Sequence, residues 1–139
     1  MIRRHFLTIA ATAAIIHPAH ASQAEIAALI RELAAGRPVA KGRITLEVPE
    51  LVENGNAVSI VAHVDALPGE VRAIHVFANG NPLPHVLTAR FGPRAGRPRI
   101  ATRFRLATSQ TVTAIAEMAD ATLHSDEVDV LVTLAACIE

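Results

Sequence analysis

The sequence predicts an all-β fold: an Ig-like antiparallel β-sandwich of about seven strands with a short N-terminal helix. From residue 42 onward, apolar side chains recur at every second position in short runs, which is the period of strands with one buried face. Turn signals rich in Gly, Pro and Asn separate these runs at regular spacing, as is typical of a sandwich. With 139 residues, the chain has room for one compact domain.

Residues 1–21 have the pattern of an export signal. Arg3 and Arg4 provide a positive start, residues 6–16 form an apolar run too short to span a bilayer as a helix, and residues 19–21 are a small-x-small cleavage site. Two large apolar residues follow the arginine pair, which favours the twin-arginine route; an ordinary secretory signal that carries two arginines is the alternative. Both predict export, with no membrane span after the signal is removed.

The segment 22–37 is predicted to be a short amphipathic helix. Ser22 and Glu25 have the spacing of a capping box, and Gly36 and Pro38 are stop signals. Helical spacing places four apolar residues on one stripe: Ile26, Leu29, Ile30 and Leu33. Because a single helix of this length is marginal in water, we expect the stripe to pack on the domain or on a partner.

Seven strands are predicted in the following domain, residues 42–134. They cover residues 44–48, 58–64, 74–78, 86–91, 100–106, 112–118 and 128–134. Asn54-Gly55 is a strong signal for a hairpin turn, Pro68-Gly69 marks the next turn, and a loop rich in Asn, Gly and Pro covers residues 79–84.

The composition excludes several classes of protein. Lys and Arg total 13 and so do Asp and Glu, and there are four Phe but no Trp or Tyr, so the chain has neither the basic footprint nor the stacking aromatics of a nucleic-acid binder. One cysteine cannot form an internal disulfide or a thiolate zinc site. Phosphate-binding glycine loops and the Gly-x-Ser-x-Gly motif are absent from the sequence. We therefore predict no cofactor and no nucleic-acid partner.

The histidines and the charged clusters carry weaker signals. His63 and His75 are expected on the outer faces of strands, and a metal site built with Met118 or Cys137 is a minor alternative, so no metal is predicted. Two charged groups are predicted to be solvated, an acidic turn and a pair on one strand face: Asp120, Asp126, Glu127 and Asp129, and Arg103 and Arg105.

Cys137 is the one candidate nucleophile. The last predicted strand ends near Leu134, which leaves a tail of Ala135, Ala136, Cys137, Ile138 and Glu139. One interpretation is a reactive, exposed thiol; the other is a small apolar residue packed under the strand end. The negative charge of Glu139 opposes thiolate formation, which suits a thiol that reacts only inside a positive pocket of another protein.

Several strings, together with this layout, resemble one family. They are Pro49 to Gly55 (PELVENG), Ala73 to Ala78 (AIHVFA), Asn81-Pro82 with Pro84, Thr102 to Ala107 (TRFRLA) and Ala114 to Asp120 (AIAEMAD). A twin-arginine-like signal, a short helix, an Ig-like domain and a lone cysteine near the C-terminus accompany them. The chain resembles the SoxY family, the sulfur-carrier subunits of the periplasmic SoxYZ complex in thiosulfate oxidation.

The resemblance implies a carrier without catalytic activity of its own. Cys137 would hold a sulfur intermediate covalently, and residues 135–139 would form the arm that presents it to periplasmic redox enzymes. A SoxZ-like subunit would form a heterodimer with the chain. The alternative, from another class, is a periplasmic Ig-like interaction module in which the cysteine is structural or links two chains by a disulfide.

The arm departs from the family pattern, which is Gly-Gly-Cys-Gly-Gly. Here Cys137 is in register, but the four glycines are replaced by Ala135, Ala136, Ile138 and Glu139. Alanine lacks the freedom of glycine at positive φ, and a β-branched isoleucine restricts the space beside the thiol. We therefore predict that a narrow channel shaped for a glycine arm rejects this tail, and that a different enzyme or a different carried group is involved.

Overall fold

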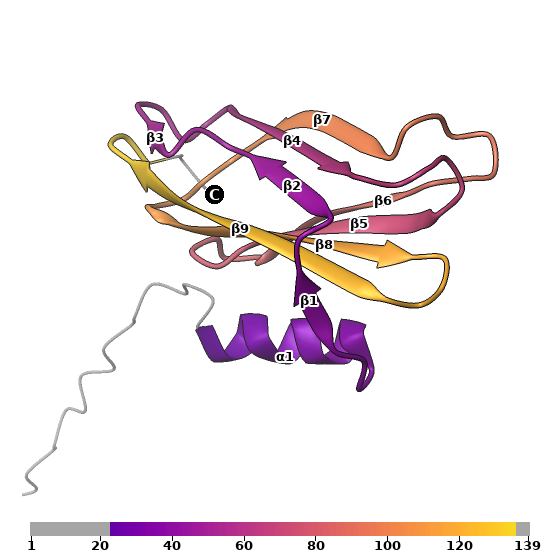
Figure 1. Cartoon of the computed structure of the whole chain (residues 1–139). Helices are drawn as coiled ribbons and strands as arrows, with labels where there is room; N and C mark the ends of the chain where they lie inside the picture. Colours follow the sequence, from indigo (N-terminus) through magenta and orange to yellow (C-terminus); the bar gives the residue numbers. More distant parts are fainter. Residues whose placement is uncertain (1–22, 136–139) are drawn as a thin grey trace, which may run out of the picture.

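A computed structural model describes residues 23–135 of the chain, which form one helix and nine strands in three layers (Figure 1). The elements are α1 (Gln23–Ala34), β1 (Val39–Lys41), β2 (Ile44–Glu47), β3 (Leu51–Val52), β4 (Val58–Val64), β5 (Val71–Ala78), β6 (His85–Arg90), β7 (Arg99–Phe104), β8 (Gln110–Met118) and β9 (Leu123–Val132).

Two sheets face each other, which confirms the predicted Ig-like sandwich. The larger has the strand order β1-β9-β8-β5-β6, with β3 also pairing with β9, and the smaller has the order β2-β4-β7. All pairs are antiparallel except β1 and β3, which both run parallel to β9. These two strands, of three and two residues, were not predicted, because such short segments show no period in the sequence.

The main core lies between the sheets, and it follows the alternation seen in the sequence. In β4, Val58, Ile60, Ala62 and Val64 are buried while the intervening positions are partly or fully exposed. In β5, however, residues 73–78 are all buried. Burial of both faces follows from the third layer, because α1 covers the face of the larger sheet that the smaller sheet leaves open (Figure 1).

The helix packs on the domain, as predicted from its apolar stripe. Ile26 is buried against a second cluster formed by Phe77, Ile115 and Leu123. The helix ends at Ala34, three residues earlier than predicted, and Ser22 of the expected capping box lies outside the described residues.

Left-handed backbone at Ala35 and Gly36, with φ of 49° and 83°, ends the helix. The Arg37 side chain then donates hydrogen bonds to the carbonyl oxygens of Leu33 and Ala34, at 3.0 and 2.8 Å. These bonds satisfy carbonyl groups that have no partner within the helix.

The hairpin expected at Asn54-Gly55 is absent, and a longer crossover takes its place. Strands β2 and β4 do pair antiparallel, from Ile44 with Val64 to Glu47 with Val61. Residues 48–57 between them leave the smaller sheet, and β3 in their middle joins β9 of the larger one. The Asn54 side chain accepts a hydrogen bond from the Asn56 backbone N–H at 2.9 Å, which shapes a local turn in this crossover.

The predicted acidic turn is wrong for three of its four residues, because β9 begins at Leu123 and places Asp126, Glu127 and Asp129 on a strand. Asp126 accepts a hydrogen bond from the Leu46 backbone N–H at 2.8 Å and so ties β2 to β9. The strand begins before the valines that predicted it, because the polar residues before Val128 are also paired with β8 by backbone hydrogen bonds.

His75 lies on the face of β5 that points away from the smaller sheet, as predicted, but it is buried there, with 6% of its surface exposed. Its Nδ1 is 2.9 Å from the Thr88 hydroxyl, and its Nε2 is 3.5 Å from a Glu117 carboxylate oxygen. Glu117 also lies 3.7 Å from Arg37 and 3.6 Å from Arg72. Burial lowers the pKa of His75 below the usual 6.5, with small contributions from His85 and Arg90, and outweighs the opposing effect of Glu117.

The lowered pKa of His75 predicts acid sensitivity. In the unfolded chain this imidazole takes up a proton near pH 6.5, whereas the folded protein resists protonation, so the free energy of unfolding falls as the pH drops below that value. His75→Gln should reduce this fall, measured by urea denaturation at pH 7 and pH 5. His63→Gln is the matched control, because the His63 side chain is 41% exposed. Equal pH dependence in the His75 variant and the unchanged protein would contradict the interpretation.

Candidate functional site

The end of β9 is where the chain leaves the sandwich toward the predicted acceptor residue. After the strand, Thr133, Leu134 and Ala135 are all exposed, and Ala135 is the last residue that the structure describes. Cys137 and the other predicted arm residues, Ala136, Ile138 and Glu139, lie outside the described residues, as do Arg3 and Arg4 of the signal. The structure therefore locates the start of the tail and the surface around it, and we call the segment from the end of β9 to Ala135 the root of the tail.

On one side, β3 holds this root by backbone hydrogen bonds. The Leu131 N–H donates to the Glu50 carbonyl at 2.7 Å, and the Thr133 N–H donates to the Val52 carbonyl at 2.9 Å. This ladder extends one residue past the end of β9 itself. The strand end is therefore anchored, although β3 contributes only two residues.

The same anchoring continues to Leu134. Its carbonyl accepts a hydrogen bond from the buried Gly55 N–H at 2.9 Å, and the Gly55 carbonyl in turn accepts one from Leu106 at 2.9 Å. These bonds join the crossover to the end of β9. The backbone is therefore held in place as far as Leu134, three residues before Cys137.

On the other side, a single side chain extends the ladder between β8 and β9. The last registered pair of these strands is Gln110 with Val130. Ser109, the residue before β8, accepts a hydrogen bond from the Val132 N–H through its hydroxyl oxygen at 2.9 Å. The backbone of β3 and Gly55 on one side and the Ser109 hydroxyl on the other thus position the root.

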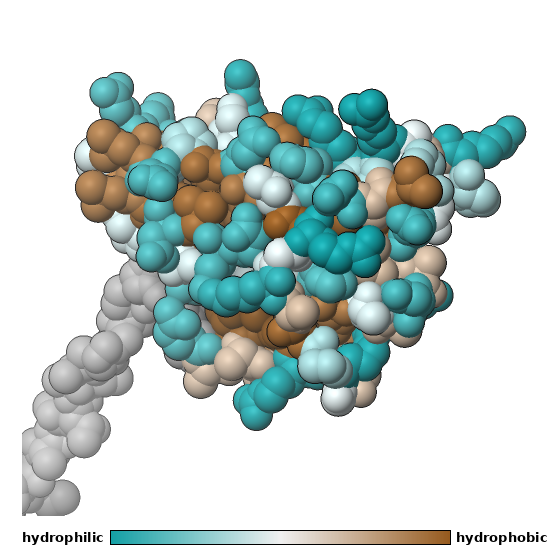
Figure 2. Space-filling view, viewed as in Figure 1, coloured by the Kyte–Doolittle hydropathy of each residue, from teal (hydrophilic) through white to brown (hydrophobic). Residues whose placement is uncertain are grey.

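Three exposed leucines surround this root, and we call Leu51, Leu131 and Leu134 the leucine patch. Their exposed fractions are 60%, 57% and 62%. Leu51 and Leu131 are in register on neighbouring strands and so lie on the same face. Figure 2 shows apolar surface gathered in this region, at the upper left over β3 and the end of β9. Both neighbours of β3, Glu50 and Glu53, are exposed.

The leucine patch was not predicted from the sequence, although one signal for it was present. Leu131 has the opposite parity to Val128, Val130 and Val132, which all face the core or its margin. One apolar residue on the polar face of a strand is ordinary by itself, and it indicates a contact surface only where other exposed apolar residues lie beside it. The last strand was predicted to extend to Leu134, but β9 ends at Val132 and Leu134 is exposed.

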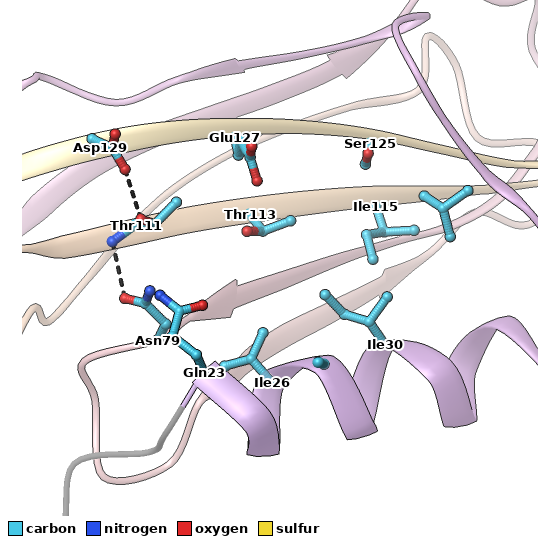
Figure 3. Close-up of a pocket in the computed structure, with 12 residues that line it drawn as sticks. Gln23, Ile26, Ile30, Asn79, Thr111, Thr113, Ile115, Ser125, Glu127 and Asp129 are labelled. Atoms are coloured by element: carbon cyan, nitrogen blue, oxygen red, sulfur yellow. Dashed lines mark hydrogen bonds between the residues drawn. The ribbon is translucent and has the colours of Figure 1, made fainter.

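A separate groove of about 410 Å³ lies between α1 and strands β8 and β9 (Figure 3). Ile26 and Ile30 line its helix side, and hydroxyl and carboxylate groups line its sheet side. The Thr111 hydroxyl donates to Asp129 at 2.6 Å, and the Thr111 N–H donates to the Asn79 side chain at 2.9 Å. These polar groups bond to one another, and no predicted site residue lines the groove.

Metal-binding clusters and membrane-spanning helices are both absent from the part of the chain that the structure describes. Within residues 23–135, no group of three or more His, Cys, Asp or Glu is arranged to hold a metal ion. Over the same residues, no helix combines the length and the apolar character that crossing a membrane requires.

Comparison with protein families gives one match. The family described as sulfur oxidation protein SoxY matches residues 30–137, a range that contains all the strands described above and ends at the lone cysteine. None of the curated protein sequences compared with the chain matches it significantly.

Solved structures with similar folds include a carrier and enzymes. The sulfur carrier protein SoxY from Chlorobium limicola f thiosulfatophilum is 24% identical, with a TM-score of 0.68, and the match covers 81% of this chain and all of the other. A superoxide reductase (neelaredoxin) from Ignicoccus hospitalis is 18% identical over 72% of this chain and 85% of the other, with a TM-score of 0.57. At these identities the likenesses establish the fold alone.

The hydrogen bond from Val132 to Ser109 predicts a local effect at the root. Ser109→Ala leaves the Val132 N–H without this partner, which should weaken the local structure by about 0.5–1.5 kcal/mol. Hydrogen exchange at the Val132 amide should therefore become faster, while amides in β4 keep their rates. Ser59→Ala, an exposed serine on β4, is the matched control. Unchanged exchange at Val132 would show that the Ser109 hydroxyl does not help to anchor the root.

Proposed function

The chain belongs to the SoxY family of sulfur oxidation proteins, and we propose that it is a periplasmic carrier subunit that holds a sulfur intermediate on Cys137. The observation that carries this proposal is that the family match extends to Cys137, the one cysteine of the chain. An anchored strand end three residues earlier supports it, because a carrier needs a rigid body with its reactive group on a short extension.

Attachment to Cys137 is an oxidation that a partner must complete. The Cys137 thiol and a sulfur compound with a terminal sulfhydryl join through a new S–S bond, and two protons and two electrons leave. The protons pass to solvent, and the electrons pass to an electron acceptor in a partner redox enzyme. Return of two electrons and two protons would release the cargo. We assign the chain the role of carrier and the redox chemistry to its partners, because the family it belongs to is one of sulfur carriers.

A second subunit belongs to this proposal. The family works as a heterodimer, and we propose a SoxZ-like β-sandwich as the partner of this chain. Export follows from residues 1–21, whose paired arginines favour the twin-arginine route. Because that route moves folded proteins, the signal on this subunit would also carry a bound partner that has none.

Cys137→Ser tests the carrier proposal directly. Protein isolated from its native periplasm during sulfur oxidation should show an additional intact mass that reductant removes, and the variant should lack it. Mass spectrometry with and without reductant measures both. If the unchanged protein carries only a free thiol under turnover, the carrier proposal fails. If the Ser variant supports full pathway activity, the interaction-module alternative is correct.

The arm predicts selectivity among partner enzymes. Replacing Ala135, Ala136, Ile138 and Glu139 by glycine restores the family arm and removes the β-branched side chain beside the thiol. Thiosulfate-oxidising enzymes of the family should then load the variant and leave the native protein unloaded, measured by the mass of Cys137. Equal loading of both proteins would show that arm shape does not determine specificity.

A further inference from the structure

We propose that the leucine patch is a docking surface for the enzyme that acts on the group carried by Cys137. This enzyme would have an apolar collar around the entrance to its active site and basic residues outside the collar. The inference rests on the proposed carrier function and adds the contact surface and the chemistry of the partner.

Exposure of the leucines is the first observation. Among residues 23–135, five large apolar residues are strongly exposed, and three of them form the leucine patch; the others are Leu67 and Leu83. Side-chain direction on paired strands aligns Leu51 and Leu131 on one face. Grouped apolar side chains on the surface of a small domain are typical of a contact site, whereas scattered ones are ordinary.

The second observation is the reach of the tail. Backbone hydrogen bonds anchor the chain up to Leu134, and Cys137 follows three residues later. Three residues of fully extended chain span at most about 11 Å. Any active site that receives the Cys137 thiol must therefore bring its rim to within that distance of Leu134, where the leucine patch lies.

The charged residues around the leucine patch indicate which charges the partner enzyme would carry outside its apolar collar. The two segments that carry the patch, residues 44–71 and 106–135, contain no Lys or Arg, and the cation next to them is exposed Arg105, directly before Leu106. Glu50 and Glu53 are exposed on either side of β3. A shallow groove of about 600 Å³ next to Leu131 is also lined by Glu50 and Asp129. An acidic border around an apolar centre is complementary to a basic border around an apolar collar.

The test uses the loading of Cys137 as its readout. A Leu51→Thr/Leu131→Thr double variant keeps β-forming residues and removes the apolar side chains. Periplasmic extract from the source cells is supplied with thiosulfate or sulfide, whichever loads the unchanged protein. At low carrier concentration the double variant should load about tenfold more slowly, because contacts at the centre of an interface dominate binding. KM should rise while kcat stays unchanged.

A matched control is the Leu67→Thr/Leu83→Thr variant, whose leucines are 69% and 80% exposed elsewhere on the domain; it should load at the normal rate. Glu53→Lys should slow loading, and added salt should reduce this difference. Iodoacetamide should alkylate Cys137 equally fast in all variants.

Each other occupant of the patch gives a distinct result. Faster alkylation in the double variant would show that the tail itself covers the patch, and loss of a homodimer or of a SoxZ-like subunit would show that the patch joins subunits. Any of these overturns the proposal. Equal loading of the double variant and the unchanged protein overturns docking while the carrier function stands. No loading of the unchanged protein refutes the carrier function, and the docking proposal falls with it.

Discussion

The backbone pairing of β9 is the interaction on which the rest of the structure depends. This strand pairs with β8 along one edge and with both β1 and β3 along the other. β1 connects the helix layer to the sheet, and β3 connects the crossover from the smaller sheet. Because both short strands add to the same long strand, the three layers meet on β9. Its end is consequently anchored more firmly than a chain terminus usually is.

A firmly anchored strand end has a consequence for chemistry near it. A group attached three residues beyond Leu134 can be separated from it by at most about 11 Å of extended backbone, so it cannot reach the opposite end of the sandwich. The same end carries the leucine patch and an acidic border. In the proposed function, attachment at Cys137 and recognition at the leucine patch would therefore be adjacent in space, as a carrier that visits several enzymes requires. The negative border also fits a thiol that becomes reactive in a positive pocket of its partner.

The helix α1 buries part of the larger sheet's outer face, which would otherwise meet solvent. In a two-layer sandwich one face of each sheet meets solvent, and strands alternate between apolar and polar residues. Here α1 covers part of the outer face, so Phe77 and Ile115 are buried on the side away from the smaller sheet. Burial of His75 follows from the same coverage of β5 together with its neighbours Thr88 and Glu117. His75, which the alternating pattern of the sequence predicts to be at the surface, is therefore buried.

Sequence alone determined the features that depend on local periodicity and on chemistry at single positions. Side-chain spacing and composition predict the helix stripe from Ile26 to Leu33, the alternating strands and the single cysteine. The sequence segments that resemble the SoxY family also predict the Ig-like fold. Only the tertiary structure decided which strands meet. β1 and β3 are too short to show a period, the Asn54-Gly55 turn opens into a crossover, and the position of Leu131 beside Leu51 depends on a parallel pairing between segments about 80 residues apart. Such pairing is set by the packing of the whole domain, because hydrogen bonds between distant strands carry no signature in either strand by itself.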